Sequence, residues 1–191
     1  MVKGHNERCK DCKQHVLELL MNIFGEVKQN YNLNLPSQPE SYIDSTYYPY
    51  LKNIYISLQS YRGYKKFVFS KKLPNIDFYL VRHQLNVEFD ESQHFTIPRK
   101  IALMGYPKEL KLGFDQNKWI DLCQRLNRKD NDPIYRDEQR AWYDTLRDFA
   151  PSILNHKPII RLYAKDHIWC DLDPEEESDQ EKFKKILNFY F

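Results

Sequence analysis

Residues 75–95 read NIDFYLVRHQLNVEFDESQHF, and this stretch predicts a hairpin of two strands with polar side chains along it. The first strand carries Asp77, and the second carries Glu88 and Asp90. From Leu85 onwards apolar and polar residues alternate, which is typical of a strand with one buried face. The alternation therefore places Glu88 and Asp90 on the same side of the hairpin.

The size and composition of the chain predict one domain spanning residues 1–191. At 191 residues with 41% hydrophobic residues, the chain can bury one substantial core. No apolar run approaches the roughly 18 residues that a membrane span needs. The N-terminal sequence MVKGHNERCK also lacks the apolar centre of a signal peptide. We therefore expect a soluble, cytoplasmic protein with no membrane partner.

The charge is unevenly distributed along the chain. The net charge is +2, but residues 171–181 contain seven acidic side chains, so residues 1–170 carry 26 basic and 20 acidic ones, a net charge of +6. A basic body permits a phosphate-rich partner without requiring one. Basic and aromatic residues also mix in YRGYKKF at 61–67, although core packing is the favoured explanation for an aromatic content of 15%.

Hydrophobic periodicity predicts helices on both sides of the hairpin in sequence. The predicted helices cover residues 11–24, 47–59, 98–104, 115–127, 134–149 and 181–188, with Pro151 ending the fifth. Further strands are expected at 66–69, 158–164 and 168–172. The twenty residues after Gly25 contain Pro36, Pro39 and many polar residues, so we expect a loop there.

The helix at 134–149 carries a stripe of alternating charge. Asp137, Arg140, Asp144 and Arg147 recur at i, i+3, i+7 and i+10, so they lie on one face of the helix. Such a stripe usually forms a solvated face with internal ion pairs. The spacing by itself therefore favours a surface role.

The carboxylates of the hairpin have the chemistry of a magnesium site. Mg²⁺ prefers oxygen ligands and is usually bound by a few carboxylates together with waters and substrate phosphates. The alternative is a wet face of the hairpin without a ligand. Gln93 and His94 weaken that alternative because they extend the polar cluster past the strand end, where α/β sheets commonly place their sites. His94 suits a general acid or base, or a group that orients a phosphate.

Four short motifs in this order resemble those of the restriction-endonuclease-like PD-(D/E)XK nucleases. They are IDF at 76–78, VEFDESQHF at 87–95, DEQR at 137–140 and IIRL at 159–162. Within that superfamily, the chain is most similar to the branch that contains the very-short-patch-repair endonucleases. The pattern of that branch is D-F, then E-x-D-G-x-x-H, then D-x-x-R on a helix, then a strand ending near an arginine.

The resemblance implies an α/β fold of the restriction-endonuclease-like type, with a small mixed sheet flanked by helices. The implied activity is that of a Mg²⁺- or Mn²⁺-dependent endonuclease that hydrolyses DNA phosphodiester bonds. The implied metal ligands are Asp77, Glu88 and Asp90. The other implied site residues are Gln93, His94, Asp137 and Arg140. The residues expected to contact the nucleic-acid backbone are Arg62, Lys65, Lys66, Lys71 and Lys72.

The chain also departs from the family pattern. Asp90 stands where most of the superfamily has a lysine, Glu91 replaces a glycine, and Pro74 lies three residues before Asp77. Residues 98–133 look like an insertion, interpreted as a substrate-recognition cap, and the helical region at about 1–62 lies outside the resemblance. These departures favour an alternative: a non-catalytic module that keeps the fold and binds nucleic acid or protein. An enzyme of small phosphorylated molecules is disfavoured, because the five glycines form no phosphate loop.

The four cysteines indicate free thiols or a metal site rather than disulfides. Cys9 and Cys12 have ligand-like C-x-x-C spacing. A structural Zn²⁺ needs four ligands, and this pair supplies two. The candidates for the others are His5, His15, Cys123 and Cys170, of which Cys123 lies on the apolar side of its helix. Zn²⁺ is therefore the second interpretation, behind metal-free thiols.

Overall fold

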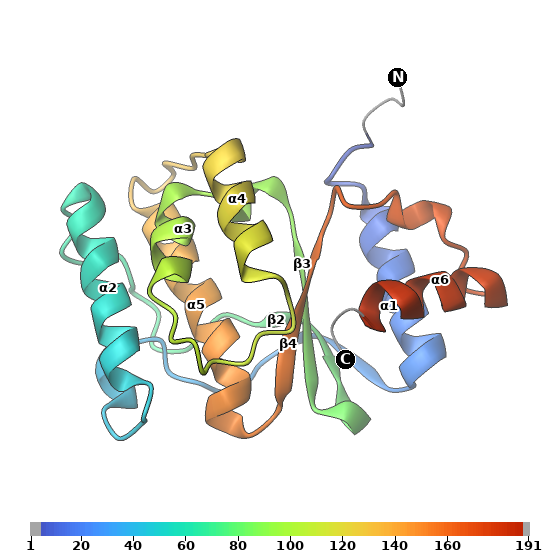
Figure 1. The fold of residues 1–191 in the computed structure, drawn as a ribbon, viewed down its shortest axis with the longest axis horizontal. Helices are drawn as coiled ribbons and strands as arrows, with labels where there is room; N and C mark the ends of the chain where they lie inside the picture. The colour runs from blue at the N-terminus through green and yellow to red at the C-terminus, as the bar shows by residue number, and fades with distance from the viewer. Residues whose placement is uncertain (1–4, 189–191) are drawn as a thin grey trace.

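The computed structural model describes residues 5–188, and a four-stranded sheet lies at its centre between two layers of helices (Figure 1). The strand order is β1-β2-β3-β4. The first three strands pair antiparallel and β4 pairs parallel with β3, so the sheet is mixed. The predicted α/β class with a small mixed sheet is confirmed.

The predicted hairpin forms the middle of this sheet. Strand β2 (Ile76–Leu80) and strand β3 (Leu85–Asp90) are joined by the short 3₁₀ helix η2 (Val81–His83). Gln84 follows with φ 50°, a left-handed conformation that reverses the chain. Phe78 pairs with Val87. One position further along, Asp77 therefore comes beside Glu88.

Strand β1 (Val27–Tyr31) lies at the edge of the sheet, although the sequence predicted a loop for these residues. Its three central residues, 28–30, are polar and exposed, so the strand has no alternating pattern to predict it. Pairing with β2 imposes the extended conformation. Stacking of Tyr31 on Tyr79, with ring centroids 4.3 Å apart, adds a cross-strand aromatic contact.

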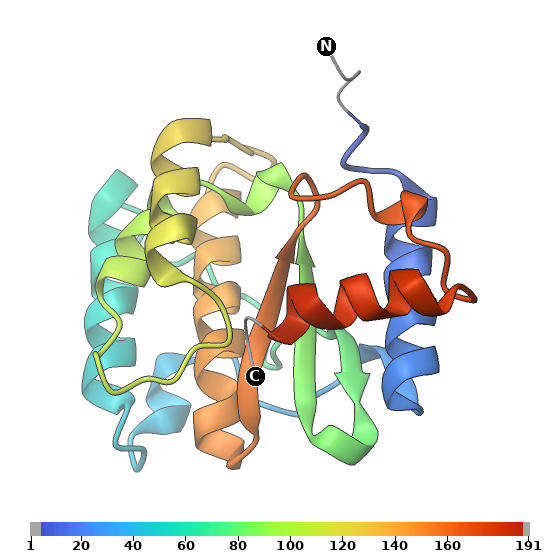
Figure 2. The same ribbon diagram turned by 45° about the vertical axis from the view of Figure 1, so that its right-hand side comes forward.

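Two helices cover one face of the sheet. Helix α1 (Lys10–Phe24) and helix α6 (Glu177–Asn188) lie together on that side (Figures 1 and 2). They cover the apolar side chains of the central strands, including Phe78, Val87 and Leu162. The 3₁₀ helix η4 (Trp169–Asp171) packs against α1 on the same side.

The other face of the sheet packs against helix α5 (Arg136–Leu154). Helices α2 (Tyr48–Arg62), α3 (Ile97–Met104) and α4 (Gln116–Leu126) complete this layer (Figure 1). Two further 3₁₀ helices are η1 (Pro39–Tyr42) and η3 (Ser92–His94). Residues 98–133 therefore do not form an appended cap, because α3 and α4 share one hydrophobic core with α2 and α5.

Two predicted strands and one predicted helix end are wrong. Residues 66–69 form no strand, although Phe67 and Val68 are fully buried, because they pack beside α5 rather than in the sheet. Residues 168–172 contain η4 instead of a strand. Helix α5 continues through Pro151 to Leu154, since burial of the residues at 149–151 offsets the hydrogen bond that proline cannot donate.

Among the described residues, no helix combines the length and apolar character that crossing a membrane requires.

Candidate active site

Asp77 and Glu88 lie next to each other on the paired strands β2 and β3. Glu88 Oε1 accepts a hydrogen bond from the backbone N–H of Asp77 at 3.2 Å. Asp77 Oδ2 accepts one from the backbone N–H of Phe89 at 2.9 Å. These two bonds tie the carboxylates to the backbone where β2 and β3 part, so both side chains are held in place.

Asp77 has a cationic partner from α1, in the helix layer that contains α1 and α6. Lys13, on α1, donates from Nζ to Asp77 Oδ1 at 2.6 Å. Both groups are partly exposed, with 41% of the Lys13 side chain and 21% of the Asp77 side chain accessible. The pair therefore lies at the border between the sheet and solvent, where it is accessible from solvent.

Glu88 is more deeply buried than Asp77. Its side chain is 5% exposed, and Arg147 Nε lies 3.5 Å from Oε1. Burial raises the pKa of Glu88 to about 7; the positive Arg147 opposes this rise, and the negative Asp77 adds to it. A carboxyl group with a strongly raised pKa beside a second carboxylate is typical of functional sites.

Asp90 has buried partners of its own, which differ from those that contact Asp77 and Glu88. Arg161, on β4 (Lys157–Tyr163), donates to Asp90 Oδ1 at 2.7 Å, and Trp119 Nε1 donates to Oδ2 at 2.9 Å. The Asp90 side chain is only 1% exposed. The resemblance implied a third metal ligand here, but this carboxylate already has a buried counter-ion and forms part of the core.

Arg161 is the centre of a buried charge network between the sheet and α5. Besides Asp90, it contacts Asp148 Oδ1 at 2.7 Å and Asp144 Oδ1 at 3.6 Å. Asp148 also accepts from Arg99 at 2.5 Å. All these charged side chains are nearly inaccessible, so their charges must balance within the protein.

His94 follows β3 and faces α5. Its Nδ1 lies 2.8 Å from Asp144 Oδ2 and 3.7 Å from Asp90 Oδ1. Burial disfavours the charged imidazole, but the two carboxylates outweigh burial and raise the pKa of His94. Burial likewise opposes the charged form of Asp144, yet His94 and Arg161 hold the pKa of that carboxyl well below its usual range. The two side chains therefore form an ion pair.

We expect His94→Gln to lower the free energy of unfolding by about 1.5–3 kcal/mol in mild acid, where the wild-type imidazole is charged. Because folding raises the pKa of His94, the charged imidazole stabilises the folded protein fully at pH values below the unfolded-state pKa of about 6.5. This stabilisation is lost as the pH rises through the folded-state pKa. Denaturant unfolding of both proteins across this window measures it. A constant difference at all pH values would contradict the ion pair.

The charged stripe of α5 is buried, so the surface role that its spacing suggested is wrong. Asp144 is fully buried, and Arg147 is 9% exposed. Asp137 instead accepts a hydrogen bond from the backbone N–H of Asp130 at 3.0 Å and lies 3.7 Å from Arg62 Nη2. The second D-x-x-R unit, Asp144 with Arg147, therefore reaches His94 and Glu88, whereas the resemblance pointed to Asp137 with Arg140.

The remaining predicted site residues surround the strand end. Arg140 donates to the carbonyl of Gln93 at 3.0 Å and to Asp130 Oδ2 at 2.9 Å. The Gln93 side chain donates to Glu91 Oε2 at 2.6 Å. Glu91 has φ −85° and ψ 167°, an extended conformation open to any residue. The backbone after Asp90 therefore does not need the glycine of the family pattern.

A basic pocket of about 230 Å³ opens beside His94. The residues that line it are Pro74, His94, Arg136, Gln139, Arg140, Tyr143 and Arg147. Three arginines and a histidine in a space of this size suit an anion. Arg147 connects the pocket to the carboxylates, because it also lies beside Glu88. The structure thus places His94 and Arg140 at one pocket, and Arg147 links that pocket to Glu88.

The predicted backbone contacts divide into two groups. Lys65, Lys66, Lys71 and Lys72 are exposed. Arg62, in contrast, forms two hydrogen bonds with Glu138 and lies 3.7 Å from Asp137 Oδ2. Arg62 therefore holds α2 against α5, while the four lysines place positive charge on the surface, with Lys72 Nζ donating to Asn34 Oδ1 at 2.9 Å.

Sequence reasoning did not identify Lys13, Asp144 or Arg147 as site residues. The sequence contained a signal for Asp144 and Arg147, because they repeat the D-x-x-R spacing of Asp137 and Arg140 seven residues later. Lys13 had none, since 64 positions separate it from Asp77 and no motif includes it. Only the packing of α1 against the sheet reveals its role.

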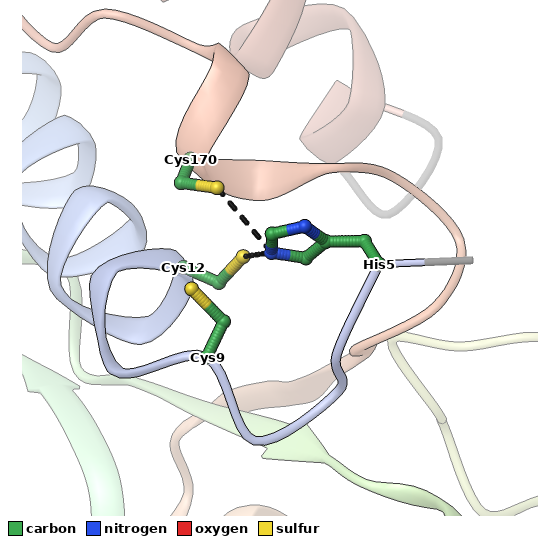
Figure 3. Close-up of side chains that lie close together, drawn as sticks. All are labelled: His5, Cys9, Cys12 and Cys170. Atoms are coloured by element: carbon green, nitrogen blue, oxygen red, sulfur yellow. Dashed lines mark hydrogen bonds between the residues drawn. The ribbon is translucent and has the colours of Figure 1, made fainter. Parts of the chain in front are cut away.

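A second group of chemically reactive side chains lies at the start of α1. His5, Cys9, Cys12 and Cys170 come together there, and their ligand atoms all lie within 4.8 Å of one another (Figure 3). Within residues 5–188, this is the one such group with three or more histidine, cysteine or acidic side chains. Cys123, on α4, is buried in the hydrophobic core, as predicted, and His15 Nδ1 bonds instead to the carbonyl of Leu172 at 2.9 Å.

Comparisons with protein-family models, with curated proteins and with solved structures each found no match to this chain.

Proposed function

We propose that this protein is a Mg²⁺- or Mn²⁺-dependent nuclease of the restriction-endonuclease-like type that hydrolyses phosphodiester bonds in DNA. The observation that carries the proposal is the cross-strand pair of Asp77 and Glu88, joined by an Asp77 N–H to Glu88 Oε1 hydrogen bond of 3.2 Å. The pair adjoins a pocket lined by arginines. Acidic and phosphate-binding groups therefore meet at one place.

The donor set fits a magnesium ion held by two protein carboxylates. Mg²⁺ commonly takes one or two carboxylates and completes its shell with waters and substrate phosphate oxygens. Asp77 and Glu88 supply those two groups, while Asp90 remains with Arg161. When bound, the ion would polarise a phosphoryl oxygen and make a nearby water more acidic.

Lys13 supports a catalytic rather than a vestigial site. Asp90 occupies the sequence position of the superfamily lysine, so the strand itself carries no ammonium group. Lys13 brings one from α1 to within 2.6 Å of Asp77. We assign Lys13 the role of orienting Asp77 and stabilising negative charge on the substrate.

The arginine-lined pocket and the exposed lysines supply phosphate contacts. Arg136 and Arg140 face the pocket together with His94. Guanidinium groups match the geometry of phosphate oxygens and stay charged at any physiological pH. Contacts of this kind give affinity for DNA without sequence preference. The proposal therefore includes no recognition sequence.

A non-catalytic module that binds nucleic acid or protein is the second candidate. The observation in its favour is that both oxygens of Asp77 already have partners, Lys13 and the N–H of Phe89. A cation must then compete with an ammonium group. This candidate keeps the basic pocket as a binding site and assigns the buried charges a structural role.

The test is cleavage of single-stranded, duplex, mismatched and branched DNA by the purified full chain. We expect strand cleavage with Mg²⁺ or Mn²⁺ and none with a chelator in excess. The absence of cleavage on all four substrates with both metals would overturn the nuclease proposal. DNA binding without cleavage, measured by fluorescence anisotropy on the same substrates, would then support the binding module.

A further inference from the structure

Two distant parts of the chain meet in the group of His5, Cys9, Cys12 and Cys170. His5 precedes α1, Cys9 is its N-cap residue, and Cys12 lies in its first turn. Cys170 comes from η4, 165 positions after His5. All four side chains point into the same small space (Figure 3).

The distances within this group match a tetrahedral metal site. His5 Nε2 lies 3.0 Å from Cys12 Sγ and 3.4 Å from Cys170 Sγ. Around one zinc ion, with bonds of about 2.0 Å to nitrogen and 2.3 Å to sulfur, neighbouring ligand atoms are roughly 3.5–3.8 Å apart. The four ligand atoms, all within 4.8 Å of one another, therefore need to change their separations by about 1 Å or less to surround an ion.

Hydrogen bonding alone accounts poorly for this arrangement. Nε2 of an imidazole carries either one N–H or one lone pair, and each points in a single direction. Two sulfur atoms nevertheless approach His5 Nε2 from different elements. A cation at the centre would satisfy the nitrogen and all the sulfurs at once. The cysteines form no disulfide, so the thiols are free to bind it.

We propose that His5, Cys9, Cys12 and Cys170 bind one structural Zn²⁺ ion. Three sulfur ligands and one nitrogen ligand in a tetrahedron suit zinc. On binding, each cysteine thiol releases its proton to solvent and forms a bond from sulfur to zinc, with no change of oxidation state. Four protein ligands close the coordination shell, so this zinc holds structure and performs no catalysis. The proposal is independent of the nuclease activity.

The ion would anchor the N-terminal segment beside the candidate active site. Glu7, between two of the ligands, accepts hydrogen bonds from the N–H and the hydroxyl of Ser92, in η3 at the end of β3. Residues 6–8 form one wall of a pocket of about 500 Å³ whose other walls include Gln93 and Arg128. Lys13, which follows the ligand Cys12, contacts Asp77. Zinc binding would therefore fix both the pocket wall and the position of Lys13.

The experiment measures the metal content of the full chain, purified under reducing conditions without chelator or added metal. We expect about one zinc ion per chain by total-metal analysis. Cys9→Ser and Cys170→Ser should lower this to well below one. Cys123→Ala is the matched control, because Cys123 lies outside the group, and it should keep the full content. Circular dichroism shows whether each variant is folded.

A second measurement covers variants that fail to fold. Wild-type protein from which zinc has been removed by a chelator should take up one equivalent of Co²⁺ and show the absorption bands of tetrahedral cobalt bound to thiolates. Hydrogen exchange of the segment at 5–13 should slow when zinc is restored. These readouts do not require DNA cleavage, so they separate this proposal from the nuclease proposal.

Three outcomes would overturn the zinc site. One is wild-type protein that carries no stoichiometric metal and takes up neither Zn²⁺ nor Co²⁺. Another is an intact mass two hydrogens lower than that of the reduced chain, which would show a disulfide in place of a metal. The third is equal loss of zinc from Cys123→Ala, which would show that metal content follows general stability rather than these four ligands.

Discussion

Arg161→Met should lower the free energy of unfolding by about 3–5 kcal/mol, because it breaks a buried network of charges. Arg161 is completely buried and contacts Asp90, Asp148 and Asp144. Methionine matches much of the arginine stem but carries no charge. Three buried carboxylates would then lose the cation that they share. Asp148 would keep its contact with Arg99.

Urea unfolding followed by circular dichroism measures this change. Arg125→Met is the matched control, because Arg125 is an exposed arginine on α4, and we expect its effect to stay within about 0.5 kcal/mol. Arg161→Lys should fall between the two, since an ammonium group keeps the charge but cannot bridge several carboxylates. A loss below about 1 kcal/mol for Arg161→Met would show that the network does not depend on this side chain.

Asp77→Asn and Glu88→Gln should each reduce metal-dependent DNA cleavage more than about 100-fold. Both substitutions preserve shape and remove a negative charge, so they weaken the proposed ion site with little change in packing. Asparagine at 77 can still accept the hydrogen bond from the N–H of Phe89. Initial cleavage rates at several Mg²⁺ concentrations distinguish weaker metal binding from slower chemistry.

Asp121→Asn is the control for these two variants, because Asp121 is an exposed acid on α4 and should leave cleavage unchanged. Melting temperatures of all the variants establish that they are folded. Cleavage by Asp77→Asn and Glu88→Gln at the wild-type rate would remove both residues from the site. If wild-type cleavage is real, the active residues would then have to be sought elsewhere, beginning with the basic pocket.

Local patterns in the sequence predicted most of the elements that build the sheet and its helices. The helical spacing of apolar residues predicted α1, α4 and α5 to within a few positions at most ends. Alternation predicted β3, and with it the shared face of Glu88 and Asp90. The helices were predictable because burial of one face leaves a periodic pattern in the sequence. Strand β3 shows alternation although all six of its residues are buried, because its polar face packs against the buried arginines Arg147 and Arg161. Edge strand β1 has no periodic pattern of apolar residues, because only its pairing with β2 holds it in an extended conformation.

The identity of the site residues depended on contacts between distant segments. The spacing on α5 gave two equivalent D-x-x-R units, and the packing of the helix on the sheet placed the second one, Asp144 with Arg147, against His94 and Glu88. The sequence motif implied that Asp90 is a metal ligand, but in the structure its carboxylate accepts hydrogen bonds from Arg161 and Trp119. The two units lie on the same face of α5, seven residues apart, so the position of the helix along its axis relative to the strands decides which unit reaches the site. That position is a tertiary property, so no motif could choose between these alternatives.

By itself, the sequence determined that the chain forms an α/β domain around a hairpin with acids on one face, because those features follow from local periodicity. Only the tertiary structure decided which charges meet. It brought Lys13 to Asp77 and His5 to Cys170, pairs that lie 64 and 165 positions apart. The physical reason is that electrostatic and metal-binding chemistry acts over a few ångströms of space, whatever the separation along the chain.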